Sequence, residues 1–326
     1  MNNLILKSIR AYKNKVTNKL FGVVNVRHTQ KKVGNALVSF ITGPFIQAPW
    51  ESLTDPHPNY WTCSEVVRLL TVRGYDVDII DWDNKTFIPK KKYDICIDLH
   101  HNLERLSPYL GPSCIKAMFI VASYPLFQNN AEKARLNNFE KRRGVKLPQK
   151  RYDPLSNNLK YIDFIAGYGN KTVHGTYPLE DKSIIPIPIP AVETYEFPED
   201  KDFETARTHF LWFGGGGAIL KGLDLVVETF AKLPHLKLSI IGPSAFEKEF
   251  EKIYAKELAL PNITRYSRPK INRDGSITTD SIPIQDILNS CGAIVSLSGS
   301  EGGGGATIQA MQAGLFPIIT PQTGIN

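Results

Sequence analysis

From residue 33 onward, the sequence alternates short apolar runs with segments that have helical hydrophobic spacing. Such alternation is typical of proteins in which helices cover a parallel sheet. The apolar runs predict strands, which lie at residues 36–43, 77–81, 93–99, 117–124, 161–167, 210–214, 236–242, 293–299 and 316–320. The pattern therefore predicts an α/β fold.

Helices fit between these strands. The clearest lies in the segment 62–76, where Gly74 stops it. Its predicted apolar face consists of Val66, Val67, Leu69, Leu70 and Val72. A strongly charged helix is predicted at 129–144. Further helices are predicted at residues 221–233, 245–258 and 282–292.

A length of 326 residues favours two domains of moderate size. The proline-rich segment at 183–204 suits an extended crossing between them. We therefore divide the chain into an arm at 1–32, a first domain at 33–195 and a second domain at 196–326. Because the last predicted strand stands six residues from the end without a covering helix, we expect the second domain to be truncated.

The formal net charge of +7 comes from the first 32 residues, which carry eight lysines and arginines. The first acidic residue is Glu51, and the rest of the chain has a net charge of −1. A nucleic-acid-binding protein needs a basic face on its folded domain. The near-neutral body therefore argues against nucleic acid as a partner.

Apolar side chains in the arm recur at helical spacing and would share one narrow face of a helix: Ile5, Ile9, Tyr12, Val16 and Leu20. Lys13, Lys15 and Lys19 would flank this face, where their charges can reach anionic lipid headgroups. The pattern predicts a helix lying on an anionic membrane surface. A solvated or disordered basic tail, or a helix docked on its own protein, remains an open alternative.

The four cysteines stand far apart and form no C-x-x-C pair, which argues against a zinc cluster or a disulfide framework. A reducing, cytoplasmic compartment is the simpler interpretation. The sequence has neither a signal peptide's apolar core nor a run of eighteen apolar residues, so we expect no membrane-spanning segment. A peripheral position on the inner face of a membrane would depend on the arm.

Two glycine-rich loops each lie between a predicted strand and a predicted helix. The first contains Gly214, Gly215, Gly216 and Gly217 and is followed by Lys221; the second contains Glu301, Gly302, Gly303, Gly304 and Gly305. Backbone amides at such loops and at helix starts favour phosphate. Ligands of open parallel sheets bind beyond the carboxyl ends of the strands, so both loops should face one crevice.

The segments KGLDLVVETF and SEGGGGATIQAMQAGLFPIIT resemble the nucleotide-sugar domain of retaining glycosyltransferases of the GT-B type, the group with an E-x₇-E signature. Residues 57–84 also resemble the first helix and second strand of that family's acceptor domain, and the resemblance covers about residues 36–326. It implies two Rossmann-like domains facing a cleft. It also implies transfer of a sugar with retention of configuration, usually without a metal.

Carried over by resemblance, Lys221 would hold the donor diphosphate and Glu301 would contact the hydroxyls of the donor sugar. Amides of Gly302, Gly303 and Gly304 would line the sugar and the phosphates. The chain departs from the family twice: the second acid of the signature falls on Gln309, and a frequent arginine falls on Gly216. Gln309 can hydrogen-bond ribose hydroxyls but lacks charge. Another cation must replace the arginine, or donor affinity is low.

His100 and His101 directly follow the predicted strand at 93–99, at the crevice end of the sheet. The family often has a histidine near the reacting carbon. Strand alternation lets only one of the two face the cleft, and we favour His101 over the alternative of two surface histidines. Asp98 fits a buried, hydrogen-bonded acid. The polar segment around Asn170, Thr172 and Thr176 resembles the family's approach to the domain crossing, or is a simple turn.

The sequence thus predicts a metal-independent glycosyltransferase of the hexosyl-transferring kind, with a nucleoside-diphosphate sugar as substrate and no cofactor. Its acceptor would be a glycan, a lipid-linked molecule or another hydroxyl compound. Lys221, Glu301 and His101 are the predicted catalytic residues. A catalytically weak nucleotide-sugar-binding subunit, a nucleotide-sugar epimerase and an adaptor acting through the arm alone remain alternatives.

Overall fold

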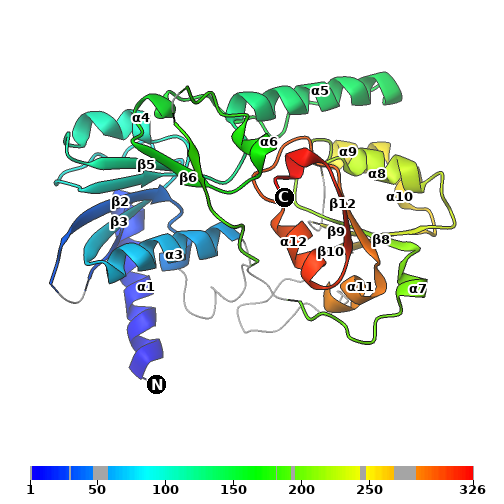
Figure 1. Cartoon of the computed structure of the whole chain (residues 1–326), viewed down its shortest axis with the longest axis horizontal. Helices are drawn as coiled ribbons and strands as arrows, with labels where there is room; N and C mark the ends of the chain where they lie inside the picture. Colours follow the sequence, from blue (N-terminus) through cyan, green and yellow to red (C-terminus); the bar gives the residue numbers. More distant parts are fainter. Residues whose placement is uncertain are drawn as a thin grey trace.

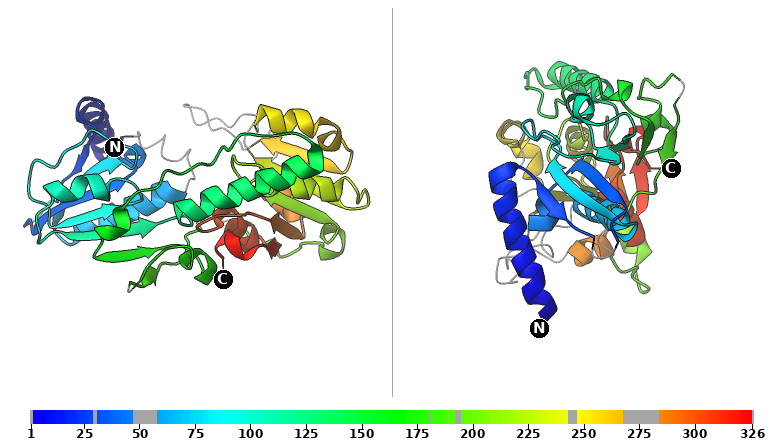
Figure 2. Two further views of the ribbon diagram at one scale, coloured as in Figure 1. Left: turned by 90° about the horizontal axis from the view of Figure 1, so that it is seen from above. Right: turned by 90° about the vertical axis from the view of Figure 1, so that its left-hand side faces the viewer.

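The structure, a computed structural model, describes residues 2–28, 31–46, 58–180, 182–191, 195–242, 247–267 and 284–325. Two α/β units lie side by side, one built on each of two sheets (Figure 1). The left view in Figure 2, from above, shows a long helix of the first half of the chain, at residues 125–143, extending over the second unit. The predicted α/β class with two parallel sheets is confirmed.

The described part of the first sheet has the strand order β1-β3-β2-β4-β5-β6-β7. Every neighbouring pair is parallel except β1 and β3. Its strands are β1 (Val24–Val26), β2 (Gly34–Phe40), β3 (Tyr75–Asp81), β4 (Ile95–Asp98), β5 (Ile115–Ile120), β6 (Phe164–Gly167) and β7 (Ile184–Pro186).

The described part of the second sheet has the order β10-β9-β8-β11-β12, and all its pairs are parallel. Its strands are β8 (His209–Phe213), β9 (Lys237–Gly242), β10 (Ile263–Ser267), β11 (Ala293–Ser296) and β12 (Phe316–Ile319). Strand β8 lies at the centre, which places the loop that follows it near the middle of the sheet's carboxyl edge.

Helices surround both sheets. Those of the first half are α1 (Asn2–Phe21), α2 (Gly43–Ile46), α3 (Pro58–Val72), α4 (Leu103–Leu106), η1 (Ser107–Tyr109), α5 (Pro125–Arg143), η2 (Asn158–Lys160) and α6 (Lys171–His174). Those of the second half are α7 (Phe203–Ala206), α8 (Leu223–Phe230), α9 (Lys248–Ile253), α10 (Ala255–Leu258), α11 (Ile284–Ser290), α12 (Gly305–Gln312) and η3 (Pro321–Thr323).

All nine predicted strands are present, with ends shifted by a few residues. Three further strands, β1, β7 and β10, were not predicted because they are short, polar or proline-containing edge strands. The predicted helix at 245–258 is divided at Tyr254 into α9 and α10, and its first two residues lie outside the described part. Residues 282–283 of another predicted helix also lie outside it.

The predicted apolar face of α3 is partly wrong. The helix packs on the sheet through Cys63, Val67 and Leu70, which are buried, whereas Leu69 and Val72 are exposed. A helix turns about 100° per residue, so Leu69 and Val72 fall on the side away from the buried face. Gly74 ends the helix as predicted, with a left-handed φ of +91°.

Helix α5 belongs to the first half of the chain but packs on the second sheet. Phe139 is fully buried in a cluster with Trp212 and with residues of α8 and α9. Near its end, Arg142 forms ion pairs with Asp224 and Glu228 of α8. The two units are therefore joined by a packed helix as well as by the crossing segment.

The arm is partly docked on its own protein. Ala11 and Asn14 of α1 are buried, and the Asn14 amide donates to the carbonyl of Phe45 at 2.9 Å. The predicted apolar face points the other way, because Ile9, Tyr12 and Leu20 are 61%, 72% and 68% exposed. The side chain of Ile5 lies outside the described part. Figure 1 shows α1 projecting from the first sheet.

All four cysteine side chains are buried free thiols. Within the described ranges, no helix is both long enough and apolar enough to cross a bilayer.

Candidate functional site

A cleft of about 530 Å³ lies between the two units, at the carboxyl ends of both sheets. Residues that follow β5 and β6 line one side, and residues that follow β8 and β11 line the other, as expected for parallel sheets. The lining residues are Pro58, Asn59, Val121, Ala122, Gln128, Arg151, Tyr168, Ile189, Trp212, Phe213, Gly214, Gly215, Gly216, Lys221, Ser296, Ser298, Glu301, Gly303, Gly304, Gly305, Ala306 and Thr307.

The first glycine loop runs from the end of β8 to α8. Gly214, Gly215 and Gly216 line the cleft, and a Cβ atom at either Gly215 or Gly216 would meet open space. Gly217 does not line it. Its amide donates to the Glu247 carboxylate at 2.7 Å, so this amide is already occupied by an anionic group of the protein. The Gly214 amide donates to the Ile241 carbonyl at 3.0 Å, so within the described ranges the loop amides open to a ligand are those of Gly215 and Gly216.

The second glycine loop runs from β11 to α12. Gly303, Gly304 and Gly305 line the cleft, so the N-terminus of this eight-residue helix faces it. The Gly305 amide itself donates to the Gly303 carbonyl at 2.8 Å. Gly302 lies instead against the backbone of Val121 in the first unit. The Ser123 hydroxyl also donates to the Glu301 carbonyl at 2.8 Å. This loop is therefore fixed against the first unit.

Lys221 and Glu301 connect the two loops through a direct ion pair between Nζ and Oε1. Both side chains are largely buried but still reach the cleft. Burial of an ion pair strengthens its attraction and removes hydration from both charges. Two residues that lie 80 positions apart in the sequence thus meet at one point.

Arg151 contributes a second cation to the cleft lining. Among the described lining residues, the charged side chains are those of Arg151, Lys221 and Glu301. We did not single out Arg151 in the sequence because the loop after α5 contains no recognisable motif. Its place beside the first glycine loop depends on the packing of α5, which the sequence pattern does not reveal.

His101 lies outside the residues that line the cleft. Its Nε2 is 3.0 Å from Asp153 Oδ1, and its ring lies 5.5 Å from the Trp82 ring. His100 does not line the cleft either, and burial lowers its pKa to about 4. A role for His101 in catalysis stays a prediction.

Gln309 is on α12 but is only 4% exposed and is not among the residues that line the cleft. Its predicted contact with ribose hydroxyls also stays a prediction.

Asp98 is a buried, hydrogen-bonded acid, as predicted. Its Oδ2 accepts bonds from the amides of Asn102 and Leu103 and from Asn158 Nδ2, and burial raises its pKa. Asn170 caps α6 and also donates to the carbonyls of Pro321 and Ile325, so it ties the two units together.

Within the described ranges, no group of three histidine, cysteine, aspartate or glutamate side chains is arranged to hold a metal ion.

No protein-family model matches the chain, and no curated protein sequence matches it. Solved structures with a similar fold include the pneumococcal O-GlcNAc transferase GtfA in complex with UDP and GlcNAc, at 16% identity and a TM-score of 0.40. The match covers 69% of this chain but only 41% of GtfA.

Two further similar structures match more of both chains. AviGT4, a glycosyltransferase involved in avilamycin A biosynthesis, has 15% identity and a TM-score of 0.46, with 89% of this chain and 79% of that chain covered. The lipopolysaccharide outer core galactosyltransferase WaaB has 13% identity and a TM-score of 0.43, with 87% and 79% covered.

Proposed function

We propose that the chain is a glycosyltransferase that moves a sugar from a nucleoside-diphosphate sugar to an acceptor hydroxyl with retention of configuration. The observation that carries this proposal is the meeting of Lys221, Glu301 and both glycine loops at one cleft. A diphosphate needs cations and open amides, and a sugar needs a carboxylate acceptor for its hydroxyls. The cleft offers all three.

The main chemical task would be to stabilise the departing nucleoside diphosphate. Preorganised donors aimed at developing negative charge lower a barrier because they need not reorganise. The Lys221 ammonium, the open amides after β8 and the N-terminus of α12 are suited to this role. We propose that they act without a metal ion, and that the acceptor hydroxyl attacks from the face the leaving group departs from.

In this proposal the Lys221–Glu301 ion pair is a resting arrangement. An incoming diphosphate would draw the ammonium toward itself, and Glu301 would then accept hydrogen bonds from the donor sugar. The acceptor would be a glycan, a lipid-linked molecule or another compound with a free hydroxyl, bound by the first unit.

Calorimetry with UDP, GDP, ADP and TDP tests the donor site. We expect one nucleotide to bind with micromolar affinity, Lys221→Ala to abolish binding, and Glu301→Ala to affect the nucleotide sugar more than the nucleotide. Lys232→Ala is the matched control, because Lys232 is an exposed lysine just after α8 and lies outside the cleft. No binding of any of the four nucleotides to the folded protein would contradict the proposal.

Transfer itself is tested with the nucleotide sugar that binds, and NMR of the product gives the anomeric configuration. A product with inverted configuration would contradict retention, and loss of activity in EDTA would contradict metal independence. Turnover without an acceptor would indicate an epimerase instead.

A nucleotide-sugar-binding subunit without turnover is the second candidate. Two observations favour it. Gln309 is buried and neutral, at the position where the family that the chain resembles has its second acid. Lys221 is already paired with Glu301. Binding with no transfer in wild-type protein, and transfer gained in Gln309→Glu, would support this candidate over the first.

We also propose that the protein is cytoplasmic and peripheral on the inner face of a membrane. The apolar face of α1 is exposed, and the exposed Lys13, Lys15 and Lys19 lie on the same helix. Sedimentation with vesicles containing phosphatidylglycerol tests this, with neutral phosphatidylcholine vesicles as control. Equal binding by wild type and by the double variant Tyr12→Ser, Leu20→Ser would contradict it.

A further inference from the structure

Two cations line the cleft, and one of them has no counterion among the residues that the structure describes. Lys221 is paired with Glu301, so its charge is already matched. Arg151 lines the same cleft, and its guanidinium forms no hydrogen bond or ion pair with any residue in the described ranges. A diphosphate carries more than one negative charge. The Arg151 guanidinium is therefore available to pair with a second negative charge of such a ligand.

The backbone of Arg151 is held by two largely buried polar side chains of α5. Both oxygens of Glu132, which is 2% exposed, accept a hydrogen bond from the Arg151 amide, at 2.9 and 3.0 Å. Gln128 donates to the Arg151 carbonyl at 2.9 Å. Because both the amide and the carbonyl are engaged, the direction in which the side chain leaves the backbone is fixed.

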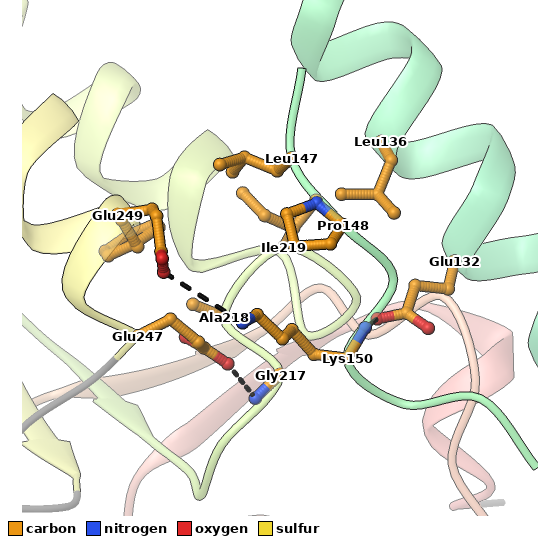
Figure 3. A pocket seen from close by; sticks show the side chains of 11 residues that line it. Glu132, Leu136, Leu147, Pro148, Lys150, Gly217, Ala218, Ile219, Glu247 and Glu249 are labelled. Atoms are coloured by element: carbon orange, nitrogen blue, oxygen red, sulfur yellow. Dashed lines mark hydrogen bonds and ion pairs between the residues drawn. The ribbon is translucent and has the colours of Figure 1, made fainter. Parts of the chain in front are cut away.

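The Arg151 side chain lies against the first glycine loop. A Cβ atom placed on Gly217 would be 2.8 Å from Arg151 Cγ and 3.8 Å from its Nε. The preceding residues lie between α5 and this loop, as Figure 3 shows for Pro148 and Lys150 beside Glu132 and Gly217. The segment thus brings a cation of the first half of the chain to a loop of the second half.

We propose that Arg151 binds the diphosphate of the nucleotide donor, as a second cation beside Lys221. This inference rests on the proposed function and names a further residue of the same site. A guanidinium is planar and can donate two parallel hydrogen bonds to phosphate oxygens. Since α5 is packed on the second unit through Phe139 and Arg142, the donor would be held by residues from both halves of the chain.

Lys150 provides the matched control. It is the neighbouring basic residue, and its amide is also held by Glu132, at 2.9 Å. Its ammonium points elsewhere, toward Glu249 at 4.0 Å, and it does not line the cleft (Figure 3). Removal of either side chain changes the net charge equally, so a difference between the two variants reports position and not overall charge.

The experiment is calorimetry with the nucleoside diphosphate that binds wild-type protein, and with the matching nucleoside. We expect Arg151→Ala to weaken diphosphate binding by about 10- to 100-fold, because a hydrogen bond to a charged group is lost. Nucleoside binding should not change in Arg151→Ala, and Lys150→Ala should bind the diphosphate like wild type. Arg151→Lys should recover part of the loss.

Two results separate this inference from the proposed function. If wild-type protein binds no nucleoside diphosphate, the donor site and the role of Arg151 both fail. If Lys221→Ala weakens binding but Arg151→Ala does not, the donor site stands and the role of Arg151 alone fails.

A rescue variant distinguishes a role of the Arg151 charge in binding from a structural role of its side chain. A Cβ at Gly216 meets open space and Gly216 lines the cleft, so a side chain added at this position in the same loop starts without a clash. We expect the double variant Arg151→Ala, Gly216→Arg to regain diphosphate affinity over Arg151→Ala. If the double variant binds the diphosphate as weakly as Arg151→Ala does, the proposal that Arg151 acts through its positive charge beside this loop is contradicted.

Discussion

The two glycine loops look alike in sequence, but they are glycine-rich for different physical reasons. In the first loop, Gly215 and Gly216 have open space where a Cβ would stand. In the second, a Cβ on Gly302 would collide with the backbone of Val121, and one on Gly303 would touch Ile189. The middle of the first loop is open toward the cleft, whereas the start of the second loop is packed against the first unit before its later glycines line the cleft.

This difference shows that a run of glycines does not by itself identify a ligand site. Glycine permits the close approach of another backbone as readily as the approach of a ligand. Substitutions in the two loops should therefore have unequal effects, and the comparison can be tested one position at a time.

The largest effect is expected for Gly302→Ala. A methyl group would overlap the Val121 carbonyl, and a backbone group cannot rotate away as a flexible side chain can. We expect a loss of about 3 kcal/mol in the free energy of unfolding, measured in urea, or a separation of the two units seen as a larger radius of gyration. A variant as stable and compact as wild type would refute the close contact.

A smaller effect is expected for Gly217→Ala. Gly217 has a φ of +88°, which costs other residues about 1–2 kcal/mol. The methyl group would also displace the aliphatic part of Arg151, so nucleotide affinity should fall along with stability. Thermal unfolding measures the stability and calorimetry measures the nucleotide affinity. A fall in stability with unchanged affinity would mean that the contact between Gly217 and Arg151 does not affect nucleotide binding.

Ser123→Ala should cost about 1 kcal/mol, because it removes one hydrogen bond to the Glu301 carbonyl. That bond fixes the second loop and not the first. We therefore expect binding of the nucleotide sugar to weaken slightly and binding of the free nucleotide to remain unchanged. An equal effect on both ligands would mean that the bond does not act through Glu301.

The smallest effect is expected for Gly216→Ala. Its Cβ would meet open space, and its φ is outside the left-handed region, so stability should change by less than about 0.5 kcal/mol. This variant is also the control for Gly302→Ala. A large loss of stability in Gly216→Ala would remove the distinction between the two loops.

The arm illustrates a different limit of sequence patterns. The spacing of Ile9, Tyr12, Val16 and Leu20 correctly predicts a helical face, but spacing does not say whether the protein covers that face. Asn14 and Asn18 make hydrogen bonds to the body instead, and the apolar face is left exposed. Which side of an amphipathic helix is docked depends on partners distant in the sequence.

Local sequence determined the elements of this protein. The apolar runs predicted nine strands at the positions where the structure has them, because a strand buried on both faces must be apolar along its length. The strand-loop-helix pattern around Lys221 and Glu301 also placed both residues at the carboxyl edge of a sheet, where they line the cleft.

Only the tertiary structure decided how these elements meet. Three contacts join residues that are far apart in the sequence. They are the ion pair of Lys221 with Glu301, the packing of Phe139 of α5 on the second sheet, and the position of Arg151 beside Gly217. Periodicity and local motifs report the environment of a residue within its own element. Contacts between elements depend on the packing of whole surfaces, which no local pattern specifies.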